Sequence, residues 1–233
     1  MPRELYELVG ANDRRFSPYC WRARLALAHK GLTADTIAVG FTDKDKVAFS
    51  GQELVPVLRD GDEVICDSWD IACYLEDRYP DAPSLFGGAI GRAQARFFNA
   101  WAPTMSATIM PMIVKDIHDR ARPEDQAYFR QSRETRFGRT LEEIHAARDA
   151  QPALFAAAAA PLRAVLGEQP FLCGETPAYA DYIVFGSFQT ARLMSPVRLV
   201  APGDVIHDWR ERMLDLFDGM ARAAPACGEG EAT

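Results

Sequence analysis

Ser17, Pro18, Tyr19 and Cys20 place a hydroxyl and a thiol at a turn where a predicted strand ends and a predicted helix begins. The sequence pattern predicts the strand at residues 4–9 and the helix at residues 19–30. The first turn of a helix carries unpaired backbone N–H groups and the positive end of the helix dipole, and both stabilise a thiolate. Sulfur chemistry at this turn is therefore the first hypothesis.

The elements around this turn alternate between strand and helix through residues 1–80, which is typical of an α/β unit. The turn Asp60-Gly61-Asp62 separates two short apolar runs at hairpin spacing, so these two strands should pair antiparallel and make the sheet mixed. Strands are predicted at residues 4–9, 34–40, 55–59 and 63–66, and helices at residues 19–30 and 68–78.

Proline and glycine, including the pair Gly87-Gly88, are concentrated just after this unit, and neither a helix nor a strand tolerates them in its interior. We therefore predict a linker over residues 81–90. Residues 91–233 show only helical periodicity, such as the steps of four from Phe97 to Trp101 to Met105. The predicted organisation is an α/β domain at residues 1–80 and an all-α domain at residues 91–233.

The charge balance of the chain argues against several classes of partner. The net charge is −7, from 26 Lys and Arg against 33 Asp and Glu, whereas nucleic acids and anionic membrane surfaces require a basic face. No segment approaches the roughly 18–20 apolar residues of a membrane span, and the polar N-terminus does not read as a signal peptide. We expect a cytoplasmic protein with no nucleic-acid or membrane partner.

Cysteine and histidine usage predicts no metal site. The five cysteines are an odd number at irregular spacing, which does not form a disulfide framework and fits a reducing compartment. Cys66 and Cys73 have no second pair and no suitably spaced histidine to complete a metal site.

Three motifs occur together with the helical second half: Ser17-Pro18-Tyr19-Cys20 at a helix start, Val55-Pro56 at a strand start, and Asp67-Ser68 at a helix start. In this combination the chain resembles the cytosolic glutathione transferases over nearly its whole length. Within that family it resembles the bacterial β-etherase-type and fungal Fua-class transferases, through the segments Ser17–Tyr19, Trp21–Arg22, His29–Gly31, Asp67–Trp69, Phe171–Asp181 and Phe217–Gly219.

The resemblance implies a thioredoxin-like domain, with a mixed four-stranded sheet and helices, followed by an all-helical domain. It also implies glutathione as co-substrate, a hydrophobic electrophile as second substrate, and a homodimer. In such folds a cis peptide bond exposes the backbone of the residue before the proline, so we expect Pro56 to be cis and Val55 to pair with the cysteinyl backbone of glutathione.

The two carboxylates of glutathione need separate partners. Ser68 and the free N–H groups of its helix start are expected to bind the γ-glutamyl carboxylate, while Asp67 binds the ammonium group. The glycyl carboxylate requires a donor before Val55, and Lys44, Lys46 and Gln52 remain open as candidates. An ordinary helix cap would use the same residue types as Asp67 and Ser68. The assignment of these two residues to glutathione binding therefore rests on the combination of the three motifs.

Ser17 is the expected catalytic residue. Glutaredoxins begin the corresponding helix with Cys-Pro-Tyr-Cys, but Ser17 stands at the first position here, where it cannot form a mixed disulfide yet can donate to a thiolate. Tyr19 is a rival donor, although its ring is expected to pack inside. Cys20 should face the interior and be inert; the alternatives are a thiol-disulfide oxidoreductase using Cys20, or a non-catalytic binder of glutathione or hydrophobic ligands.

The electrophile is expected in an apolar cleft between the Ser17 loop and the first helices of the second domain. Phe16, Trp101 and Met105 are the predicted pocket residues, and Pro103 and Pro111 are predicted to interrupt or kink their helix and so widen the cleft. The resemblance to the β-etherase-type enzymes suggests that the electrophile is aromatic and that the reactions include aryl-ether cleavage.

One motif of the family is incomplete in this chain. Tyr179-Ala180-Asp181 resembles the capping motif of the core helix, but the cap position holds Ala178 in place of Ser, Thr or Asn. The reciprocal half of the capping box is therefore predicted to be missing.

Overall fold

The computed structural model describes residues 2–228 of the 233-residue chain. Its four strands form one sheet in the order β2-β1-β3-β4. β1 pairs parallel with β2 and antiparallel with β3, and β3 and β4 form a hairpin, so the predicted mixed sheet is confirmed. The strands are β1 (Arg3–Leu8), β2 (Asp35–Val39), β3 (Val57–Asp60) and β4 (Glu63–Cys66).

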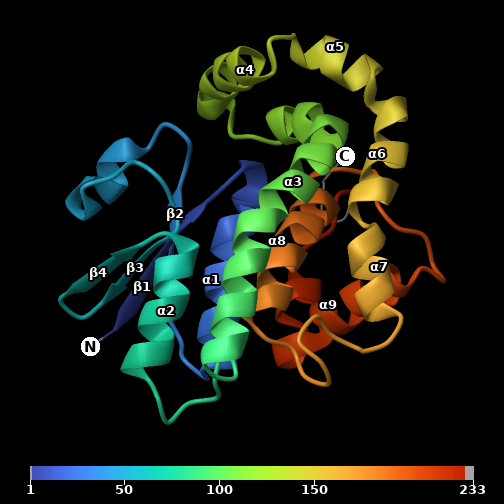
Figure 1. Cartoon of the computed structure of the whole chain (residues 1–233). Helices are drawn as coiled ribbons and strands as arrows, with labels where there is room; N and C mark the ends of the chain where they lie inside the picture. Colours follow the sequence, from blue (N-terminus) through green and yellow to red (C-terminus); the bar gives the residue numbers. More distant parts are fainter. Residues whose placement is uncertain (1, 229–233) are drawn as a thin grey trace.

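Two helices of this α/β half, α1 (Pro18–His29) and α2 (Ser68–Arg78), lie side by side next to the sheet (Figure 1). Ser17 caps α1, because its Oγ accepts a hydrogen bond from the Cys20 N–H at 3.3 Å, and Pro18 occupies the first turn, where its missing N–H costs nothing. Two short 3-10 segments, η1 (Ala11–Asp13) and η2 (Lys44–Ser50), complete this half.

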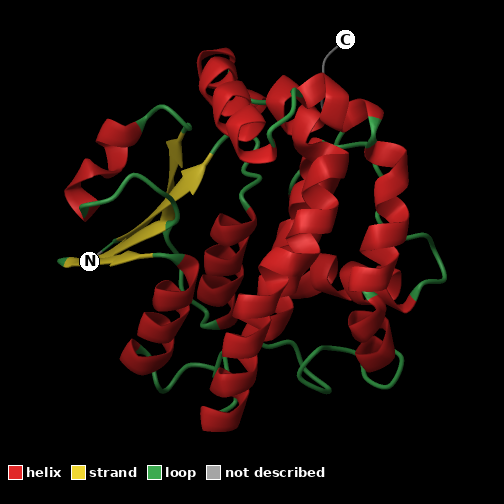
Figure 2. Ribbon diagram, turned by 45° about the horizontal axis from the view of Figure 1, so that its top comes forward, coloured by secondary structure: helices red, strands yellow, loops and turns green. Residues whose placement is uncertain are grey.

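The rest of the described chain, residues 89–228, is helical, as predicted. Residues 89–228 contain no strand, only an isolated bridge between Phe171 and Gly174. Figure 2 shows most of the helices gathered to one side of the strands. The helices are α3 (Ala89–Asp119), α4 (Pro123–Phe137), α5 (Leu141–Ala146), η3 (Arg148–Ala150), α6 (Gln151–Ala158), α7 (Ala160–Leu166), α8 (Tyr179–Met194) and α9 (Val205–Ala223).

The predicted interruption of the helix at Pro103 and Pro111 is wrong, whereas a kink there stays a prediction. α3 runs from Ala89 to Asp119 with both prolines inside it. A proline removes a single backbone N–H donor, and α3 packs against α5, α6 and α8, so tertiary contacts compensate for the lost hydrogen bonds.

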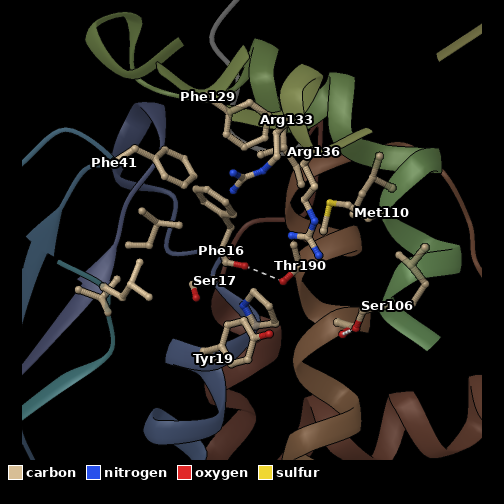
Figure 3. A pocket seen from close by; sticks show the side chains of 18 of the residues that line it. Phe16, Ser17, Tyr19, Phe41, Ser106, Met110, Phe129, Arg133, Arg136 and Thr190 are labelled. Carbon is tan, nitrogen blue, oxygen red and sulfur yellow. Dashed lines mark hydrogen bonds between the residues drawn. The ribbon is translucent and has the colours of Figure 1, made fainter. Parts of the chain in front are cut away.

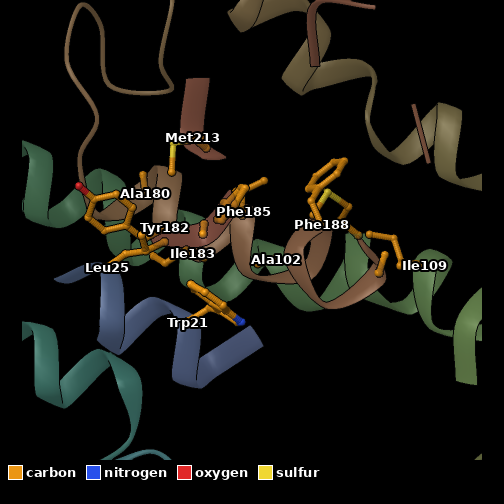
Figure 4. Packing of buried hydrophobic residues seen from close by; sticks show 14 of the residues in the cluster. Trp21, Leu25, Ala102, Ile109, Ala180, Tyr182, Ile183, Phe185, Phe188 and Met213 are labelled. Atoms are coloured by element: carbon orange, nitrogen blue, oxygen red, sulfur yellow. The ribbon is translucent and has the colours of Figure 1, made fainter. Parts of the chain in front are cut away.

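The core is centred on α8, whose residues are almost all buried. Figure 4 shows Trp21 and Leu25 of α1 packed next to Tyr182 and Ile183 of α8. A single apolar cluster extends from the sheet through α1 and α8 to α3 and α9. The two halves of the chain therefore share one hydrophobic core. No helix within residues 2–228 is long and apolar enough to cross a bilayer.

The start of α8 depends on Asp181. Ala178 offers only a methyl group at the cap position, as expected, but the fully buried Asp181 carboxylate accepts three hydrogen bonds: from the N–H of Ala178 at 3.0 Å, the N–H of Leu172 at 2.8 Å and Nε1 of Trp209 at 2.9 Å. Burial raises the pKa of Asp181 to about 6. One carboxylate thus connects the preceding loop, α8 and α9.

Replacing Asp181 with Ala is expected to lower the free energy of unfolding by roughly 3–5 kcal/mol, because three buried N–H donors lose their acceptor. Urea unfolding followed by tryptophan fluorescence measures this. The exposed Glu175 in the same segment provides the control, and Glu175→Ala should change the free energy by less than about 0.5 kcal/mol. Equal effects of the two substitutions would contradict this role of Asp181.

Candidate active site

A cavity of about 480 Å³ lies between the start of α1, the loops after β1 and β2, and helices α3 and α4. Figure 3 shows Phe16, Ser17 and Tyr19 on one side of this cavity and Met110, Phe129 and Arg133 on the other. Its size is in the range of small-molecule sites. The cavity combines a polar region at the helix start with apolar walls.

Ser17 lines this cavity at the point where α1 begins. Its Oγ accepts from the Cys20 N–H, and its side chain also interacts with the buried Cys20 thiol. A serine hydroxyl that accepts one hydrogen bond can still donate its O–H to a ligand. The hydroxyl lies at the N-terminus of α1, where the helix dipole favours negative charge.

Helix α8 fixes the position of the Ser17 loop. The Thr190 hydroxyl donates to the carbonyl oxygen of Phe16 at 2.6 Å. Two residues farther on, Pro18 lies so close to Gly186 that a Cβ added to this glycine would be 2.5 Å from the Pro18 carbonyl oxygen. The loop therefore rests directly on the backbone of α8, and only glycine fits at position 186.

The predicted cis peptide bond between Val55 and Pro56 is confirmed. Val55 lines the cavity, and its backbone N–H and C=O have no hydrogen-bond partner within residues 2–228. These two groups are free for strand-like pairing with a peptide ligand.

Asp67 and Ser68 occupy the start of α2. The Asp67 carboxylate accepts from the Trp69 N–H at 2.7 Å, and its backbone has φ 72° and ψ 139°, a conformation that is rare outside glycine. The buried Ser68 accepts a hydrogen bond at its carbonyl from the Tyr179 hydroxyl. Neither lines the cavity, but the charge of Asp67 interacts with that of Arg22, which does.

Of the three residues predicted as candidates for binding the glycyl carboxylate, one lines the cavity. Lys44 lines the cavity, 3.7 Å from the Glu53 carboxylate. Lys46 forms an ion pair with Asp43 at 2.9 Å, and Gln52 is half-buried just after η2. Neither Lys46 nor Gln52 is among the described residues that line the cavity.

The structure differs from the sequence predictions at three aromatic or sulfur-containing side chains. Tyr19 does not pack inside; its ring is 44% exposed, borders the cavity and lies under the Arg22 guanidinium at 4.6 Å. Met105 is fully buried in the core, and Trp101 packs beside Phe98; within the described chain neither lines the cavity.

The geometry of the α-helix explains why Trp101 and Met105 of α3 do not line the cavity. Successive residues are about 100° apart around a helix, so a shift of one residue changes the face. The cavity wall is formed by the neighbouring face of α3, with Pro103, Ala107, Met110 and Ile113. Phe16, in contrast, lines the cavity, and its contact with an electrophile stays a prediction.

Helix α4 supplies a wall that the sequence analysis did not assign to the site. Tyr128, Phe129, Arg133, Arg136 and Phe137 line the cavity from this helix. The eight-residue spacing of Phe129 and Phe137 is typical of one apolar helix face, but nothing in the sequence places that face opposite Ser17.

Cys20 is buried, as expected. It is 1% exposed, and burial raises the pKa of its thiol to about 12. The thiol is therefore protonated at neutral pH and shielded from disulfide substrates. Within residues 2–228, no cluster of His, Cys, Asp or Glu is suited to a metal ion.

An ion-pair cluster joins the two halves at the edge of the cavity. Arg122 binds Asp43 at 3.0 Å and the buried Asp125 at 2.7 Å, and Asp125 also accepts from the Thr42 hydroxyl at 2.7 Å. The hydrogen bond from Arg122 holds the pKa of Asp43 well below its usual range. The cluster connects the loop after β2 to the start of α4.

Comparison with known proteins gives the family. The family models for the glutathione S-transferase N-terminal and C-terminal domains match residues 16–78 and 93–202. A probable glutathione transferase of Aplysia californica is 37% identical over 87 residues, which are 36% of this chain and 94% of that sequence. The chain belongs to the glutathione transferase family.

Other members of the glutathione transferase family match parts or most of the chain. Glutathione S-transferase Z2 of Arabidopsis thaliana is 42% identical over 69 residues, 28% of this chain and only 31% of that plant protein. The fold is similar to that of GSTFuA3 from Phanerochaete chrysosporium, with a TM-score of 0.81, 24% identity, and coverage of 94% of this chain and 97% of the fungal one.

A second glutathione transferase structure contains a ligand. CsGST83044 of Ceriporiopsis subvermispora, crystallised in complex with glutathione, has a TM-score of 0.73 and 25% identity, and the match covers 96% of each chain.

We expect Gly186→Ala to displace the Ser17 loop of this transferase-family protein, because the new Cβ would overlap the backbone of Pro18. The expected loss of unfolding free energy is roughly 1–3 kcal/mol. Gly167→Ala is the matched control, because its Cβ would meet only carbonyl oxygens of its own helix, the nearest at 3.2 Å. Thermal unfolding of both variants tests the contact, and equal midpoints would argue against it.

Arg122→Gln is expected to lower the unfolding free energy by roughly 2–4 kcal/mol at pH 7, because the buried Asp125 loses its cation. The pKa of Asp43 is lowered in the folded state, so its stabilising contribution is present above about pH 4 and declines as the pH falls below that value. The difference between wild type and variant should therefore shrink below about pH 4 in denaturant titrations.

The exposed Arg198 supplies the control for this experiment, since Arg198→Gln removes the same charge without breaking a buried contact. A difference between wild type and Arg122→Gln that is constant from pH 3 to 7 would exclude the ion pair as its source.

Proposed function

We propose that this protein is a glutathione transferase that binds glutathione on its α/β half and activates the thiol through Ser17. The observation that carries the proposal is the Ser17 hydroxyl at the N-terminus of α1, which lines a cavity whose other walls are largely apolar. A hydroxyl in this place donates a hydrogen bond to a thiolate and cannot itself form a disulfide.

Glutathione would bind along the edge of the cavity nearest β3 and α2. The free backbone groups of Val55 before Pro56 suit the cysteinyl residue, and the start of α2 at Asp67 and Ser68 suits the γ-glutamyl group. The unusual backbone of Asp67 supports a functional constraint there. For the glycyl carboxylate, Lys44 lines the cavity, while Gln52 lies beyond its lining.

The glutathione complex of CsGST83044 supports glutathione as co-substrate in this fold. A hydrogen bond from Ser17 and the dipole of α1 would lower the thiol pKa by about one to two units from its free value. The thiolate then attacks the electrophile: the sulfur–carbon bond forms, the leaving group departs with its electron pair, and the thiol proton passes to solvent. Holding the two substrates next to each other in the cavity would accelerate the reaction further.

The electrophile would lie between Phe16 and the face of α3 that carries Met110, instead of against Trp101 and Met105. Apolar and aromatic walls suit a hydrophobic, aromatic substrate, including an aryl ether whose phenoxide is displaced.

We further propose that the protein is a cytoplasmic homodimer with domains at residues 1–80 and 91–233 joined by a linker at 81–90. Large apolar side chains are exposed on α3, where Ile90 is 88% and Phe97 is 65% exposed, and before β3, where Leu54 is 68% exposed. Such side chains are commonly covered by a partner. Cys20, Cys66, Cys73 and Cys173 carry free thiols, which is consistent with a reducing compartment.

The burial of Cys20 argues against a thiol-disulfide oxidoreductase at this site, because a protonated, shielded thiol cannot attack a disulfide.

The thiol pKa of bound glutathione, followed by thiolate absorbance against pH, tests the proposal. We expect a pKa below the free value in the wild type, a rise of about one unit or more in Ser17→Ala, and a roughly 10- to 100-fold lower kcat/KM at pH 6.5. Ser17→Ala also removes a helix cap worth about 1 kcal/mol, so circular dichroism must confirm folding.

Cys173→Ala is the matched control, since it removes a thiol that lies outside the described lining of the cavity. In this variant the thiol pKa of bound glutathione and the kcat/KM should equal those of the wild type. Bound glutathione with an unchanged pKa in Ser17→Ala would refute the role of Ser17, and failure to bind glutathione would refute the transferase function.

A further inference from the structure

Two arginines of α4 face the cavity without a carboxylate partner. Arg133 and Arg136 both line it, and Figure 3 shows their guanidinium groups extending from α4 toward Phe16 and Thr190. Within residues 2–228, neither forms an ion pair, and Arg136 forms no hydrogen bond. The one hydrogen bond of Arg133 is to the neutral Ser132 hydroxyl at 2.8 Å.

Their neighbours on and before the same helix are paired. Arg130 binds Glu134 and Glu142, both at 2.9 Å, and Arg122 binds Asp43 and Asp125. Arg130 and Arg122 therefore have anionic partners, whereas the two arginines of α4 that line the cavity form no ion pair within the described residues.

The surroundings of Arg133 are aromatic. Its guanidinium lies 4.6 Å from the centre of the Phe129 ring and 5.7 Å from that of Phe41. Stacking of this kind holds the guanidinium plane in place and reduces its hydration, which strengthens its attraction for an anion. Burial, and then the positive charge of Arg136, lower the pKa of Arg133.

Two like charges on one helix face are unfavourable without a counter-ion. Arg133 and Arg136 are three residues apart on α4, so they lie on the same side, and Glu53, the acidic residue that lines the cavity, faces Lys44 at 3.7 Å. An anion bound between the two guanidinium groups would relieve the repulsion and accept charge-assisted hydrogen bonds from both.

We propose that the electrophile is an aromatic molecule carrying a carboxylate, and that Arg133 and Arg136 bind this carboxylate. This inference rests on the proposed transferase function and adds to it the substrate class. The ring would lie against Phe16 and Phe41, with its reactive carbon toward Ser17, and the carboxylate would point to α4. Arg133 and Arg136 are then specificity determinants and take no part in the bond-making step.

A matched pair of substrates tests the proposal: 4-chloro-3,5-dinitrobenzoate and its neutral carboxamide. In both, the glutathione sulfur bonds to the carbon bearing chlorine, chloride leaves with the electron pair, and the thiol proton passes to solvent. We expect the wild type to show a kcat/KM, relative to the uncatalysed rate, that is roughly tenfold or more higher for the benzoate.

In Arg133→Gln and Arg136→Gln this ratio should fall to about one, chiefly through a roughly tenfold or greater rise in KM for the benzoate. The KM for glutathione should stay within about twofold of the wild type. Arg139→Gln is the control: it removes the same charge just after α4, at an exposed residue outside the described cavity lining, and should retain the wild-type ratio.

Equal relative rates for the two substrates in the wild type would overturn the inference and leave the transferase function standing. A rise in the KM for glutathione with an unchanged substrate ratio would also overturn it, since the arginines would then serve a carboxylate of glutathione.

If neither compound reacts, binding of the two preformed glutathione conjugates decides, measured by tryptophan fluorescence. Tighter binding of the carboxylate conjugate, lost in Arg136→Gln, supports the inference, and equal affinities overturn it. Failure to bind glutathione itself refutes the proposed function and this inference with it.

Discussion

The contact between the start of α1 and the middle of α8 is the constraint on which the site depends. Gly186 lets the backbone of Pro18 approach α8, and the Thr190 hydroxyl holds the carbonyl of Phe16. Because α1 belongs to the α/β half and α8 to the helical half, the same contact sets how the two halves meet. The cavity between them, and the place of Ser17 at its side, follow from that packing.

Charged side chains in the core, at the junction of the two halves and in the cavity differ in the partners that they have. The buried Asp181 is satisfied by three N–H donors and holds α8 in register with α9. At the junction, Arg122 is fully paired with Asp43 and Asp125 and holds the loop after β2 on α4. In the cavity, Arg133 faces aromatic rings without an anion. The cavity thus contains a guanidinium group whose positive charge is available to a ligand.

Local features were predictable because each rests on neighbouring residues. The helix start at Ser17-Pro18, the hairpin at Gly61 and the cis bond at Pro56 follow from capping, turn and proline chemistry, and all three agree with the structure. The predicted interruption of α3 failed for the opposite reason: packing against three other helices outweighs the local effect of two prolines.

The α/β-then-helical order, the helix start that bears Ser17 and the burial of Cys20 depend on periodicity and on short motifs, so the amino-acid sequence is enough to predict them. The packing of the helices, in contrast, sets which face of α3 meets the cavity, leaves Tyr19 exposed and brings Arg133 of α4 to the cavity lining. The reason is geometric: one residue turns a helix face by about 100°, and no local rule states which helix will lie opposite it.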